Sequence, residues 1–341
     1  MVQTDMEEKT RKTVTRNDVA KLAGVSPAVV SYVLNNSKYV SEERRTAVLR
    51  AVEELGYQPN IMARGLITKK SMLVAFVCDN LRNDWLEGAE ELLFRNGYYV
   101  SHCYSKPGPD FINMLLMRQF DGVFMMSNLF STDQLNQLAA HGIPVILYKT
   151  REYGDLDPRI VTLAPSYFDA VSKSVHYLAM KGHRKIAMIP PLRYKTKGLG
   201  GDDFRIKAYE KAMQESGLTL REELVCTRTE TMDAIKASVF DMLVCGSKEN
   251  RPTAIIAGDD YLAINLMHYI KQLGLSIPED MALVGADNTF LASAVTPGLT
   301  TVDFSKERFS AKLAEMMTQM MEGTIPESVF LDVSIVVRES A

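Results

Sequence analysis

A stretch near the amino terminus, beginning at Thr15, specifies two short helices and the turn between them in consecutive positions. Thr15, with Asp18 three positions later, is typical of a capping box, in which two side chains satisfy the first free amides of a helix. Gly24 can adopt the left-handed conformation that ends a helix. Ser26 followed by Pro27 is a favoured N-cap and first residue for the next helix. The spacing therefore predicts a helix, a short turn and a second helix.

The second of these helices has two distinct faces. Val30 and Val33 lie on one side, where they can pack against the first helix. Ala28, Ser31 and Asn35 recur at spacings of three, four and seven, so they share the opposite, outer side. A helix pair whose second member presents such a face is typical of modules that enter the major groove of DNA. The same shape also occurs as a plain structural hairpin, so the shape alone leaves both interpretations open.

A third helix is predicted after a short connection. Ser41, followed by two glutamates, marks its start, and Gly56 marks its end. Val48, Val52 and Leu55 form an apolar stripe along it. Three small helices that share one core therefore account for the chain up to about residue 58.

Charge is unevenly distributed along the 341 residues. The formal net charge at pH 7 is −3, but residues 11–70 contain 11 Lys and Arg against 5 Asp and Glu, a net charge of +6. Residues 1–10 carry a net charge of −2, and the chain from residue 71 onward carries −7. A basic amino-terminal part suits contact with a phosphate backbone, whereas the acidic remainder needs another role.

Several function classes are disfavoured by composition. The four cysteines, Cys78, Cys103, Cys226 and Cys245, are scattered, so the sequence predicts neither a disulfide framework nor a zinc site. The amino terminus lacks the apolar core of a secretory signal, and no apolar run approaches the length of a membrane span. We expect a cytoplasmic protein without a metal or cofactor. No acid, base or nucleophile constellation converges, so the sequence does not predict an enzyme.

From residue 72 the pattern changes to short apolar runs that alternate with helical periodicity. Strands are expected at MLVAFVC, YYVSHC, DGVFMM and PVILY, and the rhythm restarts with KIAMI, TAIIA, MALVGAD and LTTVDF. This alternation predicts parallel strands with crossover helices, arranged in two similar α/β lobes. Ligand clefts in such folds lie at the carboxyl ends of the strands.

Several motifs match a known family. DVAKLAGVS, VVSYVLN, VSEERR and LGYQPNIMARGL are similar to the corresponding segments of the lactose-repressor-like (LacI) bacterial transcription regulators. The resemblance continues more weakly over the lobes through KGHRKIAMI, FRIKAYEKAM, AGDDYLAINLM and PEDMALVGADN. It implies an α/β protein with an N-terminal helix-turn-helix three-helix DNA-binding domain and a hinge helix. A two-lobed periplasmic-binding-protein-like domain of two doubly wound parallel sheets is then expected to follow.

The expected domain boundaries follow from this pattern together with the family. They are a disordered tail at 1–12, the helix-turn-helix domain at 13–58, the hinge helix and linker at 59–70, a first lobe at 71–182 and 304–332, and a second lobe at 183–303 and 333–341. The three crossings between the lobes are implied by the family and not by the periodicity.

The resemblance also implies which residues contact DNA. In the family, the second helix approaches bases and phosphates, and the hinge helix enters the minor groove, where Leu66 matches a leucine that wedges between bases. Tyr32 stands where many relatives have arginine, so contacts with thymine methyl groups and DNA shape must contribute more of the selectivity. The expected DNA-binding residues are Thr15, Arg16, Asn17, Ser26, Pro27, Ala28, Val29, Ser31, Tyr32, Asn35, Tyr39, Ser41, Tyr57, Asn60, Ala63, Arg64 and Leu66.

A second set of residues matches positions that the family uses to hold its effector. Two carboxylates and a guanidinium suit a polyhydroxylated ligand, because they accept hydrogen bonds from hydroxyl groups and donate to them, and an aromatic ring can stack on a sugar face. The expected effector-binding residues are Trp85, Ser127, Arg205, Asp259 and Asp287. Ala164 stands where the family often has aspartate, and Asp259 replaces a common asparagine, so the pocket differs from that of typical relatives.

The sequence thus predicts a sequence-specific DNA-binding transcriptional regulator. We expect a homodimeric repressor of carbohydrate-metabolism genes that binds double-stranded operator DNA. A small effector, a sugar or a related polyol or nucleoside, would bind between the lobes and control it. The alternative is a LacI-type regulator controlled by a partner protein, with a non-functional small-molecule cleft. A solute-binding protein of a transport system would share the lobes but would lack residues 13–66.

Overall fold

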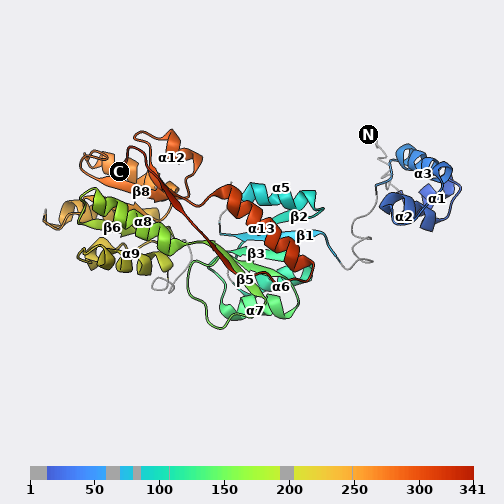
Figure 1. Cartoon of the computed structure of the whole chain (residues 1–341), viewed down its shortest axis with the longest axis horizontal. Helices are drawn as coiled ribbons and strands as arrows, with labels where there is room; N and C mark the ends of the chain where they lie inside the picture. Colours follow the sequence, from blue (N-terminus) through green and yellow to red (C-terminus); the bar gives the residue numbers. More distant parts are fainter. Residues whose placement is uncertain (1–13, 59–69, 80–85, 107, 193–202, 248) are drawn as a thin grey trace, which may run out of the picture. The chain divides into compact units, whose positions relative to one another are not determined.

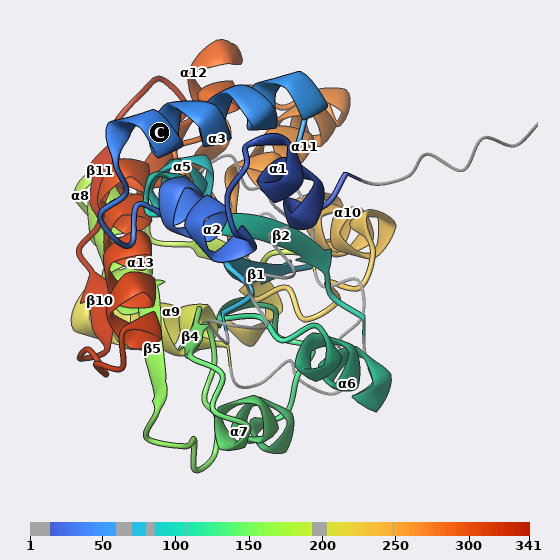
Figure 2. The ribbon, with the colours of Figure 1, turned by 90° about the vertical axis from the view of Figure 1, so that its right-hand side faces the viewer.

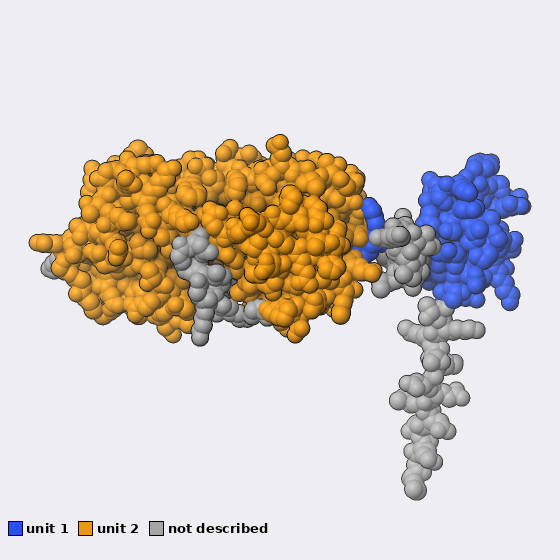
Figure 3. All heavy atoms as spheres, turned by 90° about the horizontal axis from the view of Figure 1, so that it is seen from below, with its two compact units in different colours: residues 1–71 blue, residues 72–341 orange. Residues whose placement is uncertain are grey.

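The computed structural model describes residues 14–58, 70–79, 86–106, 108–192, 203–247 and 249–341. The chain forms two compact units, residues 1–71 (unit 1) and residues 72–341 (unit 2) (Figure 3). Each unit has its own hydrophobic core. Among the described helices, none combines the length and the apolar character that crossing a membrane requires.

Unit 1 contains the three helices predicted from the sequence: α1 (Arg16–Leu22), α2 (Pro27–Asn35) and α3 (Glu42–Leu55). The capping box at the start of α1 is confirmed, because the Thr15 backbone amide donates to the Asp18 carboxylate over 2.8 Å and the Asp18 amide donates to the Thr15 hydroxyl over 3.4 Å. Gly24 has a φ of +66°, the left-handed conformation that the turn requires. The Ser26 hydroxyl accepts from the Val29 amide and caps α2.

The three helices of unit 1 share one small core. Its buried members are Val19, Ala20, Val30, Val33, Val48, Ala51 and Tyr57. Each helix contributes at least two of them. Because α1 and α3 both pack on the inner face of α2, its outer face stays available.

The first lobe of unit 2 is built on a parallel sheet with the strand order β10-β5-β4-β3-β1-β2. Its strands are β1 (Leu73–Cys78), β2 (Tyr99–Tyr104), β3 (Gly122–Met126), β4 (Val145–Leu147), β5 (Ile160–Pro165) and β10 (Val329–Leu331). Two helices, α5 (Glu87–Arg95) and α13 (Lys306–Met321), pack on one face, and α6 (Pro109–Met117) and α7 (Thr132–Ala140) pack on the other (Figures 1 and 2).

The second lobe is built on a sheet with the order β11-β9-β8-β7-β6. Its strands are β6 (Ile186–Ile189), β7 (Ala254–Ala257), β8 (Ala282–Ala286), β9 (Thr300–Asp303) and β11 (Ser334–Val336), of which only β11 runs antiparallel to its neighbour. Helices α8 (Tyr167–Met180) and α9 (Phe204–Glu215) cover one face, and α10 (Met232–Phe240), α11 (Asp260–Gln272) and α12 (Phe290–Ala294) cover the other. Figure 1 labels α8, α9 and α12, and Figure 2 labels α10 and α11. Two single turns, Glu222–Leu224 and Asp241–Cys245, complete this lobe.

The first crossing between the lobes lies earlier than expected. The boundary near residue 182 would place α8 in the first lobe, but Val171, Val175 and Leu178 of α8 pack with the second lobe's Ile186 and Met188. The chain therefore leaves the first lobe between β5 and α8. The next two crossings lie between β9 and α13 and between β10 and β11.

Candidate functional site

The outer face of α2 carries small and polar side chains. Ser26, Pro27, Ala28 and Asn35 are exposed, and Ser31 is half-buried. The Asn35 side-chain amide donates to the Ser31 carbonyl oxygen over 2.9 Å and approaches the Ser31 hydroxyl at 3.1 Å, so the two side chains are held together. This face offers hydroxyl and amide groups next to apolar surface, a combination that can contact base edges and thymine methyl groups.

A cation lies beside this face. The Lys38 ammonium is 5.0 Å from the centroid of the Tyr32 ring, within cation–π range. Arg45 of α3 donates a hydrogen bond to the Asn36 side chain over 2.9 Å. This bond joins the end of α2 to α3. Cationic side chains at such a place can contact phosphates, and phosphate contacts position a recognition helix without reading sequence.

The other predicted DNA-binding residues fall into four groups. Thr15, Asn17, Tyr39 and Ser41 are exposed, and Arg16, Val29 and Tyr32 are half-buried. Tyr57 is only 8% exposed and its ring belongs to the core of unit 1, so its contact with DNA stays a prediction. Asn60, Ala63, Arg64 and Leu66 lie outside the described residues.

In unit 2, the predicted effector residue Arg205 already has a partner inside the chain. Asp203, the N-cap of α9, accepts hydrogen bonds from the Arg205 Nε at 3.0 Å and the Arg205 Nη2 at 3.1 Å. The Asp203 side chain is fully buried and the Arg205 side chain is 12% exposed. The guanidinium also lies 4.8 Å from the centroid of the Tyr167 ring. Burial alone would lower the pKa of Arg205, but Asp203, together with Tyr167 and Tyr148, outweighs burial and raises this pKa, so the guanidinium stays charged.

Aromatic side chains from both lobes meet beside this pair. The Tyr167 hydroxyl, at the start of α8, donates to the Tyr148 hydroxyl, just after β4, over 2.5 Å. Phe304 packs edge-on against Tyr167, and Phe309 of α13 packs against Tyr148. Burial raises the pKa of Tyr148 and that of Tyr167, so both hydroxyls are neutral and remain hydrogen-bond donors.

The lobes also touch through backbone next to this cluster. The Phe204 amide donates to the Thr150 carbonyl oxygen over 3.2 Å, and Arg151 forms an isolated bridge with Asp203. The Lys149 ammonium lies 5.7 Å from the Phe204 ring centroid. The start of α9 is thereby joined to the segment after β4, so a change in the angle between the lobes must alter these contacts.

The other two predicted carboxylates, Asp259 and Asp287, differ in whether they accept a hydrogen bond. Asp259 caps α11, because its Oδ1 accepts from the Leu262 amide over 2.7 Å. Asp287 follows β8 with a φ of +100°, an unusual conformation for a residue with a side chain, and its carboxylate has no hydrogen-bond partner among the described residues. Burial, then the negative charges of Asp259 and Asp260, hold the pKa of Asp287 well above its usual range.

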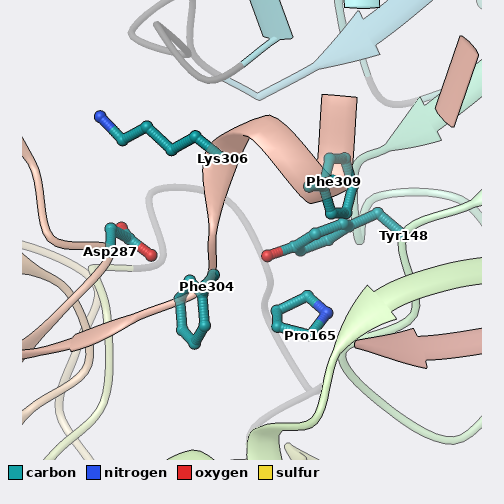
Figure 4. A pocket seen from close by; sticks show the side chains of 6 residues that line it. All are labelled: Tyr148, Pro165, Asp287, Phe304, Lys306 and Phe309. Atoms are coloured by element: carbon teal, nitrogen blue, oxygen red, sulfur yellow. The ribbon is translucent and has the colours of Figure 1, made fainter. Parts of the chain in front are cut away.

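Asp287 faces a small cavity at the lobe junction. The cavity has a volume of about 20 Å³ and is lined by Tyr148, Pro165, Asp287, Phe304, Lys306 and Phe309. In Figure 4 the Asp287 carboxylate and the Tyr148 hydroxyl point toward each other across it, and the Lys306 ammonium lies away from the rings. Such a space holds about one water-sized group.

Ser127, at the end of β3, is placed in a different cluster. Its hydroxyl and that of Ser105 both donate to Asp79 Oδ1, and the Leu129 amide donates to the Ser127 hydroxyl over 3.2 Å. Ser127 is buried and committed to these bonds, whereas Asp79 is exposed. Asp79 is thus the exposed carboxylate of this cluster. Trp85 lies outside the described residues.

Comparison with known proteins decides the family. The model of bacterial regulatory proteins of the lacI family matches residues 15–60, and a periplasmic binding protein-like domain matches residues 175–341. Catabolite control protein A of Priestia megaterium is 30% identical over 330 residues, which cover 93% of this chain and 95% of that protein. This chain belongs to the LacI family.

Other relatives agree with this assignment. The transcriptional repressor PurR of Proteus mirabilis is 31% identical to this LacI-family chain and is matched over 89% of both. A crystal structure of the lac repressor dimer, bound to operator and the anti-inducer ONPF, superposes with a TM-score of 0.79 over 96% of this chain and 99% of that one, at 23% identity. The chain is thus a DNA-binding transcription regulator with a helix-turn-helix domain and the lac repressor fold.

Sequence reasoning missed part of the cleft of this LacI-family chain. Asp203, Tyr148 and Tyr167 were not predicted, although they surround Arg205 and Asp287. Asp203 had a usable signal, since a carboxylate before an apolar helical run is a common N-cap. The two tyrosines had none, because they come from different lobes and are brought together only by the fold.

Buried Asp260 predicts a pH dependence of stability. Asp260 is fully buried and accepts bonds from the Thr289 amide at 2.7 Å, the Thr289 hydroxyl at 3.0 Å and the Thr301 hydroxyl at 2.5 Å. Burial raises the pKa of Asp260 to about 6, despite these bonds. Because the native state holds this proton more tightly than the unfolded chain, the contribution favours folding below pH 4 and is lost as the pH rises through 6.

Urea unfolding at pH 4.5 and pH 7.5 measures this contribution. Asp260→Asn keeps an oxygen for Thr289 and removes the titration. The stability of the wild type relative to this variant should therefore fall by about 2 kcal/mol from pH 4.5 to pH 7.5. A difference that does not change with pH would show that Asp260 does not titrate in this range.

Proposed function

We propose that this chain is a homodimeric repressor that binds a near-palindromic operator through α2 and is controlled by a small effector held between the lobes of unit 2. The observation that carries the proposal is the outer face of α2. It is exposed, and the capping box of α1 and the shared core of the three helices hold it rigidly. The net charge of +6 over residues 11–70 supports it, since basic groups supply most of the attraction to DNA.

Dimerisation is supported by geometry and by a relative. A two-fold operator with half-sites about one helical turn apart needs two readers of this size. The superposed lac repressor structure is a dimer bound to operator. Two copies of this chain, each placing one α2 in the major groove, are therefore the proposed DNA-bound form.

The proposed effector is a sugar or a related polyol or nucleoside, and the regulated genes serve carbohydrate metabolism. Catabolite control protein A supports the choice of genes by its name, and the CelR regulator, solved in complex with cellobiose, is 25% identical with a TM-score of 0.64. An effector that changes the angle between the lobes shifts the chain between two arrangements. Coupling of this kind typically supplies about 1–3 kcal/mol, or about 5- to 150-fold in operator affinity.

Operator affinity with and without candidate effectors tests this proposal. The full chain should bind a selected fragment as a dimer, and at least one sugar, polyol or nucleoside should change the dissociation constant within the range just given. Size-exclusion chromatography with light scattering checks the stoichiometry on the same complex. A monomer that saturates one half-site, or an affinity that no effector of these classes changes, would contradict the proposal.

A second candidate is control by a partner protein. The observation that favours it is that Arg205 is occupied by Asp203 and the cavity beside Asp287 holds only about one water-sized group. Thermal-shift measurements against sugars, sugar phosphates and nucleosides distinguish the two. A shift with any of them supports the small effector, and no shift with all of them supports the partner protein.

A further inference from the structure

The cavity beside Asp287 has the size of one charged group and not of a whole metabolite. Its volume of about 20 Å³ exceeds the space that a single water needs and is far below the several hundred Å³ of a metabolite pocket. An ammonium group is close to a water molecule in size. The cavity therefore suits the end group of a ligand whose remainder lies elsewhere in the cleft.

Among the described residues, no hydrogen bond or ion pair joins a cation to the Asp287 carboxyl group, although the charges of Arg205 and Lys306 act on it and lower its pKa. The guanidinium of Arg205, the nearest buried cation, donates to the Asp203 carboxylate through Nε and Nη2. The positive charge of Arg205 and the negative charge of Asp203 therefore cancel within the pair. Asp259 and Asp260 add negative charge behind Asp287. This charge raises the pKa of Asp287 in addition to burial, which is the larger cause. The Lys306 stem lines the cavity, but in Figure 4 its ammonium lies at the end away from the rings.

The opposite wall of the cavity is aromatic. The rings of Tyr148 and Phe309 have centroids 5.8 Å apart, and Phe304 closes the cavity on a third side. Aromatic rings attract a cation through their negative faces, and a carboxylate adds a charge-assisted hydrogen bond. Rings around a water-sized space with an unpartnered carboxylate form the combination by which proteins recognise amines.

We propose that the effector of this cleft carries a primary amine whose ammonium group occupies the cavity between Asp287 and the rings of Tyr148, Phe304 and Phe309. This inference rests on the proposed function and adds a primary amine to its effector, as in an amino sugar; a diamine supplies the same group without a sugar and tests the amine by itself. The ammonium donates to the Asp287 carboxylate and neutralises it. A phosphate or carboxylate in this place would face the Asp287 carboxyl group, with Asp259 and Asp260 behind it, and is disfavoured relative to an ammonium group.

Matched ligands that differ in one group test the inference on the full-length chain. D-glucosamine, D-glucose and D-glucose 6-phosphate form one set, D-galactosamine, D-galactose and D-galactose 6-phosphate a second, and 1,4-diaminobutane with 1,4-butanediol a third. In at least one set, calorimetric titration should show the amine binding about 10- to 100-fold more tightly than its hydroxyl counterpart. A charge-assisted hydrogen bond accounts for a difference in affinity of this size.

Two variants locate the effect. Asp287→Asn should reduce the affinity for that amine about 10- to 100-fold and bring it close to that of the hydroxyl counterpart, because the amide keeps the shape and loses the charge. Asp133→Asn, which makes the same exchange at an exposed position of α7, should leave the preference for the amine unchanged.

Three results would overturn the inference: equal binding of amine and hydroxyl ligands, preference for a phosphate, or binding by no member of any set. An amine preference that survives in Asp287→Asn would also overturn it. Operator binding is measured on the same preparations. Its loss would contradict the proposed function, whereas intact operator binding without an amine preference would contradict only the amine site.

Discussion

Ala28→Glu should weaken sequence-specific operator binding at least about 100-fold while leaving the chain folded. Ala28 is exposed at the second position of α2, on its outer face. A glutamate there suits the positive end of the helix, so unit 1 should keep its stability. On DNA the same carboxylate would lie against phosphates and base edges with no group to receive it, and repulsion would remove both affinity and base contact.

Fluorescence anisotropy with a labelled operator fragment measures this effect. Gln214→Glu is the matched control, since it adds the same charge at an exposed position of α9 in unit 2. The control should change the dissociation constant by less than about threefold, because the added charge lies on unit 2, outside the helix-turn-helix unit, and salt screens exposed charges. An Ala28→Glu protein that binds as tightly as the control would show that this face of α2 does not meet DNA.

Asp203→Ala is expected to destabilise unit 2 by about 3–5 kcal/mol. The change leaves the Arg205 guanidinium buried without its partner and also removes the N-cap of α9. Asp203→Asn should lose less, because the amide oxygen can still cap α9 and accept one bond from Arg205. The order wild type, Asp203→Asn, Asp203→Ala is therefore expected in unfolding free energy.

Urea denaturation followed by circular dichroism checks this order. Asp241→Ala is the control, since it removes an ion pair with Arg228 of similar length, 2.9 Å, whose side chains are both more than half exposed. Surface pairs of this kind contribute less than about 1 kcal/mol. Equal losses at Asp203 and Asp241 would mean that the buried pair is not a structural element of the cleft.

The fold was predictable wherever the signal is local. Ser26 and Pro27 mark the start of α2. The alternation of apolar runs with helical periodicity predicted eight strands that the structure contains. The sequence pattern missed β5, β10 and β11, which are short or lie next to polar connections. Helix α8 was placed in the wrong lobe, because the face it buries is decided by tertiary packing with Ile186 and Met188 and not by its own sequence.

More of the candidate DNA-binding face than of the candidate effector site was predictable from the sequence. On α2, exposure follows from helical spacing, so Ala28 and Asn35 were assigned to the outer face correctly. In the cleft, Arg205 stays a predicted effector residue, and the sequence did not indicate that its Nε and Nη2 donate to Asp203, two residues before it. Tyr148 and Tyr167 meet across the lobes at the ends of separate elements, and no spacing within one segment encodes such a meeting.

Selection of genomic DNA fragments by the purified full-length chain tests the central claim most directly. We expect recovery of a small set of fragments that share a near-palindromic site, with half-sites about one helical turn apart. Binding should persist at physiological salt, and Ala28→Glu should abolish the enrichment. Recovery of fragments without a common sequence, bound weakly and released by moderate salt, would contradict the claim that unit 1 reads DNA for a regulator.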